Sequence, residues 1–307
     1  MRILVYGAGV LGGLHAARLY EAGHHVSLVA RGERFTTLQQ RGVLLARGNS
    51  PVIEQLSVPV VDTPAGRYDA TLVFVRTHQV DAVLQSIAEF NSTDGGDSGD
   101  VLFLLNWAAG PEPLGDVIGH ERVLLGFANS GGTMDGEVIR YRRDTLLTRF
   151  VSMSLGEPDG RTTPRLERII QTLRSAGFKA RVEPQMDAWL KTHAAFEVPL
   201  GQAVHAAGGL EALAGHPPAL RSMIEGMRQN LASLPGRPVP RAFNALRIVP
   251  EAVLVPVFRR FLRSTAAEPL STDSPAVSAE LDRLASQLRA LARHRPGARD
   301  SRGLELG

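Results

Sequence analysis

The feature that most constrains the fold of this chain is a glycine-rich turn over residues 7–12. An apolar, β-branched run over residues 2–6 ends abruptly in a Gly-x-Gly-x-x-Gly turn, and a helix-like pattern follows. Gly7 permits a tight turn out of a strand, Gly9 lets the backbone approach a pyrophosphate, and Gly12 lets the helix pack against the sheet. The helix amides and positive dipole end would face the anion. We therefore predict a dinucleotide-binding turn made of Gly7, Ala8, Gly9, Val10, Leu11 and Gly12, whereas a strand–turn–helix corner without a ligand is the plainer alternative.

Length and composition limit the class of protein. At 307 residues the chain is long enough for two domains, and 44% hydrophobic residues indicate a folded globular protein. The chain contains no cysteine, which excludes disulfides, thiolate metal sites and thiol nucleophiles, and we expect no metal site. No leader pattern and no apolar stretch of spanning length is recognisable, so we expect a soluble, cytoplasmic protein that does not associate with a membrane.

The basic residues do not form the pattern of a nucleic-acid-binding surface. The formal net charge is +3, the arginines are scattered, and only 6% of the residues are aromatic. We therefore expect no nucleic-acid partner. Only two basic residues are lysines, Lys179 and Lys191. Because a lysine can be tuned to donate a proton near neutral pH and an arginine cannot, each lysine is a candidate for proton transfer.

The residue at the end of the second predicted strand, over residues 25–30, distinguishes between the two nicotinamide dinucleotides. An acidic residue there binds the ribose 2′-hydroxyl of NAD, whereas an arginine accommodates the 2′-phosphate of NADP. Here the strand ends at Arg31, with Arg34 close behind it and no acidic residue at the strand end. We therefore predict NADP(H) as the cofactor, although two surface arginines on a loop remain the alternative.

Strands and helices alternate through the first part of the chain. Apolar runs over residues 70–75, 100–105 and 122–127 indicate further strands, and residues 43–61 suggest a small inserted hairpin. This order predicts an α/β, Rossmann-like domain over residues 1–183 with a mostly parallel, doubly wound sheet. Ligands bind beyond the carboxyl ends of such strands, where Gly7, Arg31, Arg76 and Asn106 are expected.

From residue 184 onward the pattern is helical, which predicts an all-α second domain over residues 184–307. Long helices are expected over residues 186–207, with a kink at Pro199, over residues 217–234 and over residues 250–264. A last helix begins at about residue 275 and carries apolar residues at helical spacing.

The chain resembles the ketopantoate reductase (2-dehydropantoate 2-reductase) family over nearly its whole length. The likeness rests on the N-terminal glycine turn, Arg31-Gly32, the Val75–Gln79 segment and Leu105-Asn106. It rests most on Met186-Asp187-Ala188-Trp189-Leu190-Lys191, which looks like that family's Trp-x-Lys helix. Members pair an NADPH-binding Rossmann domain with a helical domain, and the substrate lies in the cleft between them.

The resemblance implies roles for individual residues. Lys191 would be the general acid that protonates the ketone oxygen, and Asn106 would contact the nicotinamide side of the cofactor. Arg76 stands where the family usually has a lysine that binds cofactor or substrate. Glu280, in Ala-Glu-Leu-Asp, would bind substrate hydroxyls, although a solvent-exposed pair with Arg283 is an equally good interpretation.

The departures from the family concern the substrate. Its catalytic helix carries two asparagines after the lysine, and the corresponding positions here are Ala195 and Pro199, or Ala194 and Val198 in the other register. Trp107 follows Asn106 where the family has a small residue. A site without partners for a substrate hydroxyl selects against that substrate.

We therefore expect an oxidoreductase that uses NADPH to reduce a 2-oxo acid or related ketone, with a small-molecule substrate and a possible homodimer. An authentic 2-dehydropantoate 2-reductase and a non-catalytic NADPH-binding or redox-sensing protein remain the alternatives. Retention of Lys191 argues against the sensor, because cofactor binding alone does not need it.

Overall fold

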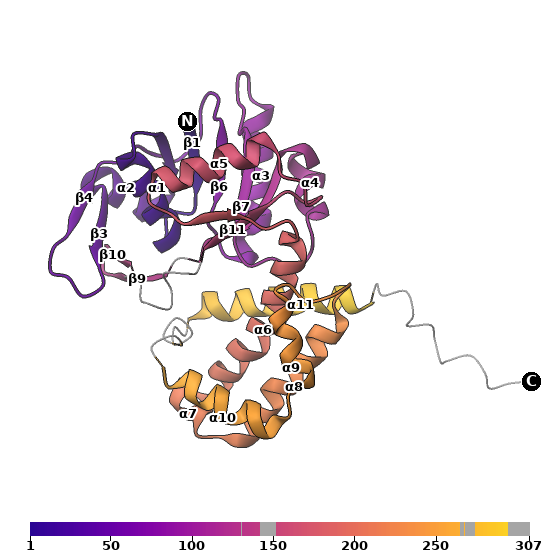
Figure 1. The fold of residues 1–307 in the computed structure, drawn as a ribbon. Coiled ribbons are helices and arrows are strands. Elements are labelled where there is room, and N and C mark those ends of the chain that lie inside the picture. Colours follow the sequence, from indigo (N-terminus) through magenta and orange to yellow (C-terminus); the bar gives the residue numbers. More distant parts are fainter. Residues whose placement is uncertain (130, 142–151, 265–266, 268–273, 294–307) are drawn as a thin grey trace, which may run out of the picture. The chain divides into compact units, whose positions relative to one another are not determined.

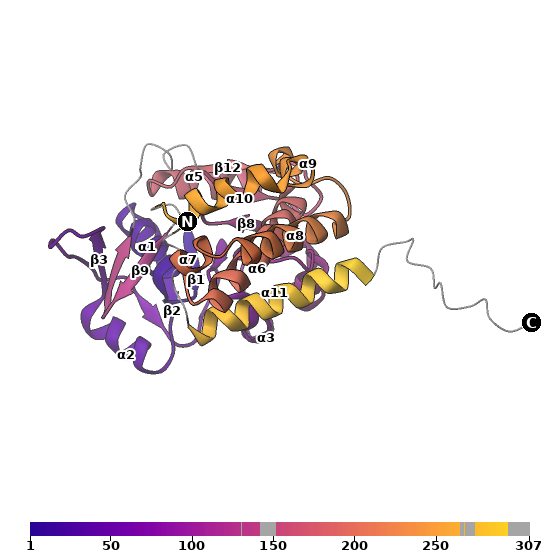
Figure 2. The ribbon, with the colours of Figure 1, turned by 90° about the horizontal axis from the view of Figure 1, so that it is seen from below.

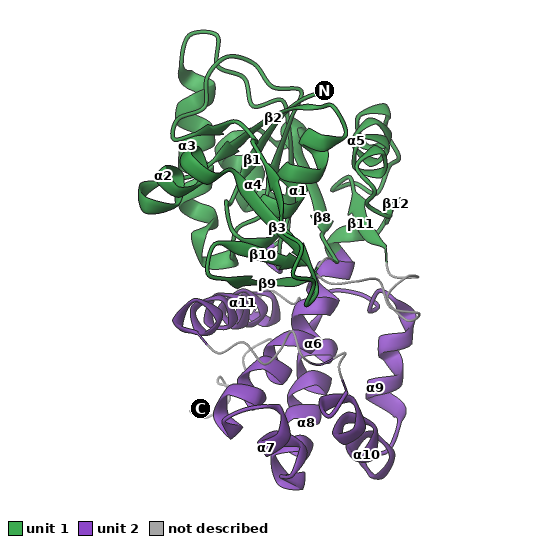
Figure 3. Cartoon of the chain, turned by 90° about the vertical axis from the view of Figure 1, so that its left-hand side faces the viewer, with its two compact units in different colours: residues 1–106, 110–187 green, residues 107–109, 188–307 purple. Residues whose placement is uncertain are grey.

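The computed structural model describes residues 1–129, 131–141, 152–264, 267 and 274–293. It divides into two compact units (Figure 3). The first unit comprises residues 1–106 and 110–187, and the second comprises residues 107–109 and 188–307. Each unit is therefore built around its own core.

The first unit is centred on an eight-stranded sheet with the order β12-β11-β8-β7-β6-β1-β2-β5 (Figure 1). Its strands are β1 (Arg2–Tyr6), β2 (His25–Val29), β5 (Val60–Val61), β6 (Ala70–Val73), β7 (Asp100–Leu104), β8 (Val123–Phe127), β11 (Met153–Gly156) and β12 (Ala180–Val182). Only β8 and β11 pair antiparallel within this sheet. The predicted α/β class with a mostly parallel sheet is confirmed.

Helices cover the sheet because each parallel connection must cross one of its faces. The helices of this unit are α1 (Val10–Glu21), α2 (Gly32–Arg41), α3 (Val80–Ser92), α4 (Glu112–Ile118) and α5 (Pro164–Ser175). The chain moves from β1 to β2 in one direction along the sheet and from β6 to β7 in the other. Right-handed crossovers therefore place α1 and α3 on opposite faces. Short 3₁₀ turns at Thr77–Gln79 and His120–Arg122 precede α3 and β8.

A second, four-stranded sheet packs on α1. Its order is β4-β3-β10-β9, made of β3 (Val43–Arg47), β4 (Glu54–Leu56), β9 (Gly132–Asp135) and β10 (Val138–Tyr141). A Cβ atom on Gly13 would lie 2.5 Å from the Cδ1 atom of Ile139, so glycine allows this close contact. Of the inserted hairpin expected over residues 43–61, β3 and β4 pair antiparallel and belong to this larger sheet, because β10 pairs with β3 in parallel. Strand β5, at the end of the same segment, pairs with β2 in the eight-stranded sheet instead.

The second unit is helical in its described part. Its helices are α6 (Met186–Ala207), α7 (Leu210–Ala214), α8 (Pro217–Ser233), α9 (Ala245–Ile248), α10 (Glu251–Leu262) and α11 (Pro275–Arg293), with a 3₁₀ turn at Arg241–Asn244. Helix α11 packs against α6 and α8 (Figures 1 and 2). A Cβ atom on Gly201 of α6 would lie 2.9 Å from both Cδ atoms of Leu281 of α11, which shows how closely the two helices pack.

Several short elements lie where the sequence patterns indicated none. They include α5, β11 and β12 in the first unit and α7 and α9 in the second. Strands of three or four residues and helices of four or five residues are too short to establish a periodicity. Helix α5 is different, because it has 12 residues and buries Leu166, Ile169, Ile170 and Leu173 at helical spacing, so its pattern is present in the sequence. No helix in the described ranges of the chain has the length and apolar character required to cross a membrane.

Candidate active site

The glycine turn between β1 and α1 has the geometry that its sequence predicts. Gly7 has a φ of 101°, and a Cβ atom there would lie 2.2 Å from the carbonyl oxygen of Phe74. A Cβ atom on Gly12 would lie 1.9 Å from the carbonyl oxygen of Gly7. Both positions therefore require glycine for the fold itself.

Gly9 differs from the other two glycines because it is exposed and has open space around it. A Cβ atom there would meet no heavy atom within 4 Å. Gly9 is also the residue before α1, whose first turn carries no acidic side chain and no side-chain cap. A helix N-terminus without an anionic neighbour attracts an anion, and the bare backbone of Gly9 lets that anion approach.

This turn lies where the topology of the sheet places a ligand. The strand order reverses between β1 and β6, because β2 follows β1 on one side and β7 follows β6 on the other. Open α/β sheets bind ligands at such a reversal, beyond the carboxyl ends of the strands. The amide of Phe74, after β6, donates to the carbonyl oxygen of Tyr6 at 2.8 Å and holds the two strand ends together.

Both arginines that follow β2 lie beside this turn, but they do so in different ways. The Nη2 atom of Arg31 donates to the Oγ atom of Ser86 on α3 at 3.3 Å. The Nε atom of Arg34 donates to the carbonyl oxygen of Ala8 at 3.0 Å. Burial lowers the pKa of Arg34 from its usual value. Arg31 is the more exposed of the two and is the better placed to meet a ligand from solvent.

Arg76 and Asn106, which follow β6 and β7, are linked through a residue that sequence analysis did not single out. The buried hydroxyl of Thr77 donates to the carbonyl oxygen of Asn106 at 2.6 Å. The backbone amide of Arg76 donates to the Oε1 atom of Gln79 at 3.1 Å. The structure therefore brings the segments of Arg76 and Asn106 together at neighbouring strand ends, as predicted from the parallel order of the strands.

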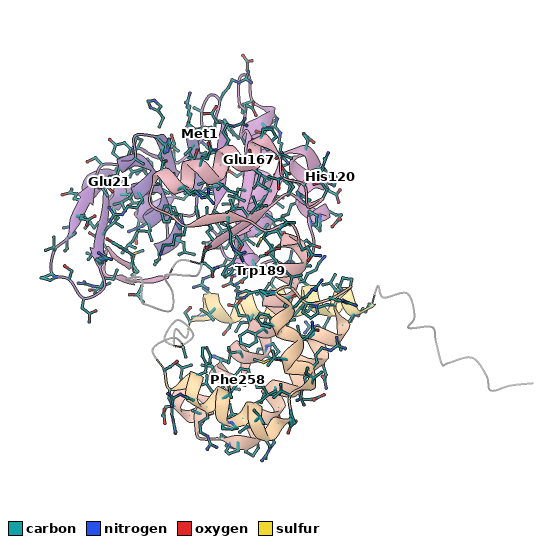
Figure 4. The ribbon with its side chains drawn as sticks, in the orientation of Figure 1. Met1, Glu21, His120, Glu167, Trp189 and Phe258 are labelled. Atoms are coloured by element: carbon teal, nitrogen blue, oxygen red, sulfur yellow. The ribbon has the colours of Figure 1, made fainter. Side chains whose placement is uncertain are left out.

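Lys191 is half-buried on α6 in the second unit. It comes two residues after Trp189, which Figure 4 labels. Trp189 stacks on His193 with ring centroids 5.2 Å apart, and the Nε2 atom of His193 lies 3.0 Å from the Oε2 atom of Glu197. Residues two apart on a helix are turned by about 200° from each other. Trp189, His193 and Glu197 therefore form a stripe on a different side of α6 from Lys191.

The side of α6 that follows Lys191 is apolar and buried. Ala194, Ala195 and Val198 are at most 3% exposed, and they pack with apolar residues of α8 and α11 and with Ala108. The positions that would correspond to substrate-binding asparagines are thus part of a hydrophobic core in either register, apart from the half-buried Pro199. Glu280 lies half-buried on α11, next to Leu281.

The predicted kink residue Pro199 lies inside α6, and its missing N–H is compensated from α8. Proline leaves the carbonyl oxygen four residues earlier without its helical donor. The Nδ2 atom of Asn230 donates to that carbonyl oxygen, on Ala195, at 3.4 Å. Sequence analysis did not identify Asn230, because α8 itself shows no reason for an asparagine there.

A cavity of about 850 Å³ lies in the second unit, between the part of α6 after Val198, α8 and α11. Its polar lining residues are Gln202, His216, Ser222, Gln229, Asn230 and Arg289. Neither Lys191 nor Glu280 lines this cavity, so it is separate from the residues for which the family resemblance implies chemistry.

Comparison with known proteins finds similarity to one family. Residues 3–150 match the model of the family described as ketopantoate reductase PanE/ApbA. A relative from Mesorhizobium japonicum named 2-dehydropantoate 2-reductase is 26% identical over 211 residues, which cover 62% of this chain and 63% of that protein. The aligned part of the chain thus spans less than two thirds of the length of this curated relative.

Two solved structures share the fold over almost the whole chain. A 2-dehydropantoate 2-reductase from Geobacter metallireducens GS-15 superposes with a TM-score of 0.64 at 18% identity, covering 95% of this chain and 98% of that one. A D-mandelate dehydrogenase with NADH and anilino(oxo)acetate has a TM-score of 0.63 at 14% identity, covering 95% and 99%. At these identities the two structures establish the fold alone. Residues 3–150 thus carry the ketopantoate reductase domain, and the chain fits a divergent member of the ketopantoate reductase family.

Proposed function

We propose that this protein is an NADPH-dependent reductase that converts a 2-oxo acid or a related ketone into the alcohol. The observation that carries the proposal is Arg31, a cationic residue at the end of β2 beside a glycine turn whose geometry suits a pyrophosphate. A guanidinium group binds phosphate by strong charge-assisted hydrogen bonds, and an acidic residue at this position would repel it. The D-mandelate dehydrogenase of the same fold is bound to NADH, so the preference for NADPH depends on residues such as Arg31 and not on the fold.

The residues of the first unit fit a dinucleotide. We assign the pyrophosphate to the turn from Gly7 to Gly12, the 2′-phosphate to Arg31, and the nicotinamide side to Asn106, with Arg76 near the cofactor or substrate. The bound cofactor supplies a hydride to the carbonyl carbon. We assign cofactor binding to residues 1–183 and substrate binding to residues 184–307, although the compact units of the structure divide at residues 187 and 188.

Lys191 is proposed as the general acid. A ketone that accepts a hydride at carbon develops negative charge on its oxygen, and an ammonium group stabilises that charge and donates the proton that completes the alcohol. Lys191 is half-buried on α6, so its side chain is partly shielded from water. We assign to Glu280 the role of binding a polar group of the substrate.

The substrate is proposed to be more apolar than ketopantoate. Where the family has asparagines for the substrate, this chain has buried Ala195 and half-buried Pro199, or buried Ala194 and Val198. A hydroxyl group that enters a site without hydrogen-bond partners loses its bonds to water without replacement. Branched or aromatic 2-oxo acids without a hydroxyl group are therefore the preferred candidates.

The test is NADPH oxidation by purified protein with ketopantoate and a panel of branched and aromatic 2-oxo acids. We expect turnover to be fastest with an apolar member of the panel. Turnover confined to ketopantoate would instead identify an authentic 2-dehydropantoate 2-reductase. Tight NADPH binding without turnover of any compound would favour a sensor.

The chain offers a matched control for the role of Lys191. Lys191→Ala is expected to lower turnover by about a hundredfold or more while NADPH affinity is retained, because a general acid contributes roughly that factor. Lys179→Ala removes the only other lysine and is expected to leave turnover unchanged. Equal turnover in the Lys191→Ala variant and the wild type would refute the general-acid assignment. A homodimer is also part of the proposal, and light scattering at several protein concentrations tests it.

A further inference from the structure

We propose that Ser86 determines the preference for a 2′-phosphorylated cofactor by holding the guanidinium group of Arg31 in place. This inference rests on the proposed function, because it takes Arg31 as the ligand of the 2′-phosphate. It concerns a residue for which the glycine motif and the family resemblance imply no role. Ser86 is a positioning residue in this proposal, since it acts through Arg31.

Three elements of the first unit meet at the Ser86 hydroxyl. Ser86 lies half-buried on α3, the helix that follows β6. Its Oγ atom accepts a hydrogen bond from Nη2 of Arg31 at 3.3 Å and is hydrogen-bonded to the Tyr6 hydroxyl at 3.2 Å. Tyr6 is the last residue of β1, and Arg31 follows β2. The three side chains therefore form a chain of hydrogen bonds across the carboxyl ends of two adjacent strands.

Tyr6 fixes one end of this series of three hydrogen-bonded side chains. The residue is only 3% exposed, so its ring has little freedom to move. Burial raises the pKa of Tyr6, and its phenol therefore stays protonated at neutral pH and can donate to Ser86. A hydroxyl held by a buried neighbour is a better-oriented acceptor for Arg31 than a water molecule would be.

The hydrogen bond to Ser86 matters for affinity because Arg31 itself is exposed. A free arginine side chain loses substantial conformational entropy when it is fixed against a ligand. Ser86 already restricts the side chain before the ligand binds, so less entropy is lost on binding. The benefit applies only to ligands that contact Arg31, which are those with a 2′-phosphate.

The test compares two nucleotides by calorimetric titration, independently of turnover. Adenosine 2′,5′-bisphosphate carries the 2′-phosphate and adenosine 5′-monophosphate lacks it. Ser86→Ala is expected to weaken binding of the bisphosphate roughly three- to tenfold, which corresponds to the loss of one hydrogen bond. The affinity for the monophosphate should not change. Ser86→Thr retains the hydroxyl and is expected to restore the bisphosphate affinity. Ser92→Ala, which removes an exposed hydroxyl from the same helix, is the control and should change neither affinity.

The Arg31→Ala variant separates failure of the inference from failure of the proposed function. Ser86→Ala in the Arg31→Ala background should have no further effect on the bisphosphate. If Arg31→Ala leaves the ratio of the two affinities unchanged, the NADPH assignment itself is wrong. If Arg31→Ala lowers the ratio and Ser86→Ala does not, only the role of Ser86 is overturned. An equal loss for both nucleotides in Ser86→Ala would show a merely structural role and would also overturn it.

Discussion

The backbone amide of Ala108 donates a hydrogen bond to the Oε1 atom of Gln287 at 2.9 Å, although the two residues are 179 positions apart in the sequence. Both groups belong to the second unit, which includes residues 107–109 even though the flanking residues belong to the first. Ala108 is fully buried and Gln287 is 8% exposed. Gln287 is a polar residue on the apolar side of α11, and the hydrogen bond explains its position. The buried amide of Ala108 needs an acceptor, and the side chain of Gln287 provides one.

Replacing Gln287 should destabilise the second unit. In Gln287→Leu the buried amide of Ala108 loses its acceptor, which we expect to cost about 1–3 kcal/mol of unfolding free energy. Urea denaturation measures this loss. Ser286→Ala, at the exposed neighbouring position, should be close to neutral. A Gln287→Leu variant as stable as the wild type would show that the bond contributes nothing to stability.

Substitution of two glycines of the turn should have different effects, on stability at Gly12 and on ligand affinity at Gly9. Gly12→Ala places a methyl group 1.9 Å from the carbonyl oxygen of Gly7, so we expect a marked loss of thermal stability. Gly9→Ala adds a methyl group in open space, so the melting temperature should hardly change while dinucleotide affinity falls at least tenfold. Thermal unfolding and nucleotide titration of both variants check this. Unchanged affinity in Gly9→Ala would contradict the placement of the pyrophosphate.

His15 should make the first unit sensitive to acid. This histidine is fully buried between Phe74 and Phe178, with ring centroids 4.4 and 4.0 Å away, and its Nδ1 atom lies 2.7 Å from the carbonyl oxygen of Leu11. Burial lowers its pKa from 6.5 to about 4. Between these two values the unfolded chain binds the proton and the folded chain does not, so stability falls as the pH falls from 6.5 to 4.

The expected loss from His15 over this range is on the order of 3 kcal/mol. His15→Leu should flatten the dependence of the unfolding free energy on pH between 6.5 and 4. His25→Leu, which removes an exposed histidine, should retain the wild-type dependence. Denaturant titrations at several pH values give the comparison, and equal slopes in wild type and His15→Leu would rule out His15 as the source.

Asn230 should stabilise the protein only while residue 199 is a proline. Asn230→Ala removes the donor for the carbonyl oxygen of Ala195, and we expect a loss of about 1 kcal/mol. In Pro199→Ala the new backbone N–H can bond to that oxygen, so the same change at Asn230 should cost less. A double-mutant cycle measures this coupling, with Gln229→Ala on α8 as the exposed control. Full additivity of the two substitutions would contradict the compensation.

Sequence patterns predicted the features whose cause is local. The glycine turn, the alternation of strands and helices, the proline inside α6 and the cationic end of β2 each depend on residues a few positions apart. The family resemblance named from the N-terminal turn and the Trp-x-Lys helix was confirmed by comparison. The roles of Lys191, Asn106, Arg76 and Glu280 remain predictions, because the structure places their elements without showing the reaction.

The sequence by itself determined a glycine-rich turn between a strand and a helix and an arginine at the end of the next strand, since spacing and residue type are enough for both. Only the tertiary structure decided what surrounds them. Ser86 reaches Arg31 over 55 positions and Tyr6 over 80, while Gln287 reaches Ala108 over 179. No periodicity or motif marks such pairs, because each side chain is ordinary in its own helix or strand. These pairs form because the fold brings a donor and an acceptor that are distant in the sequence within hydrogen-bonding distance.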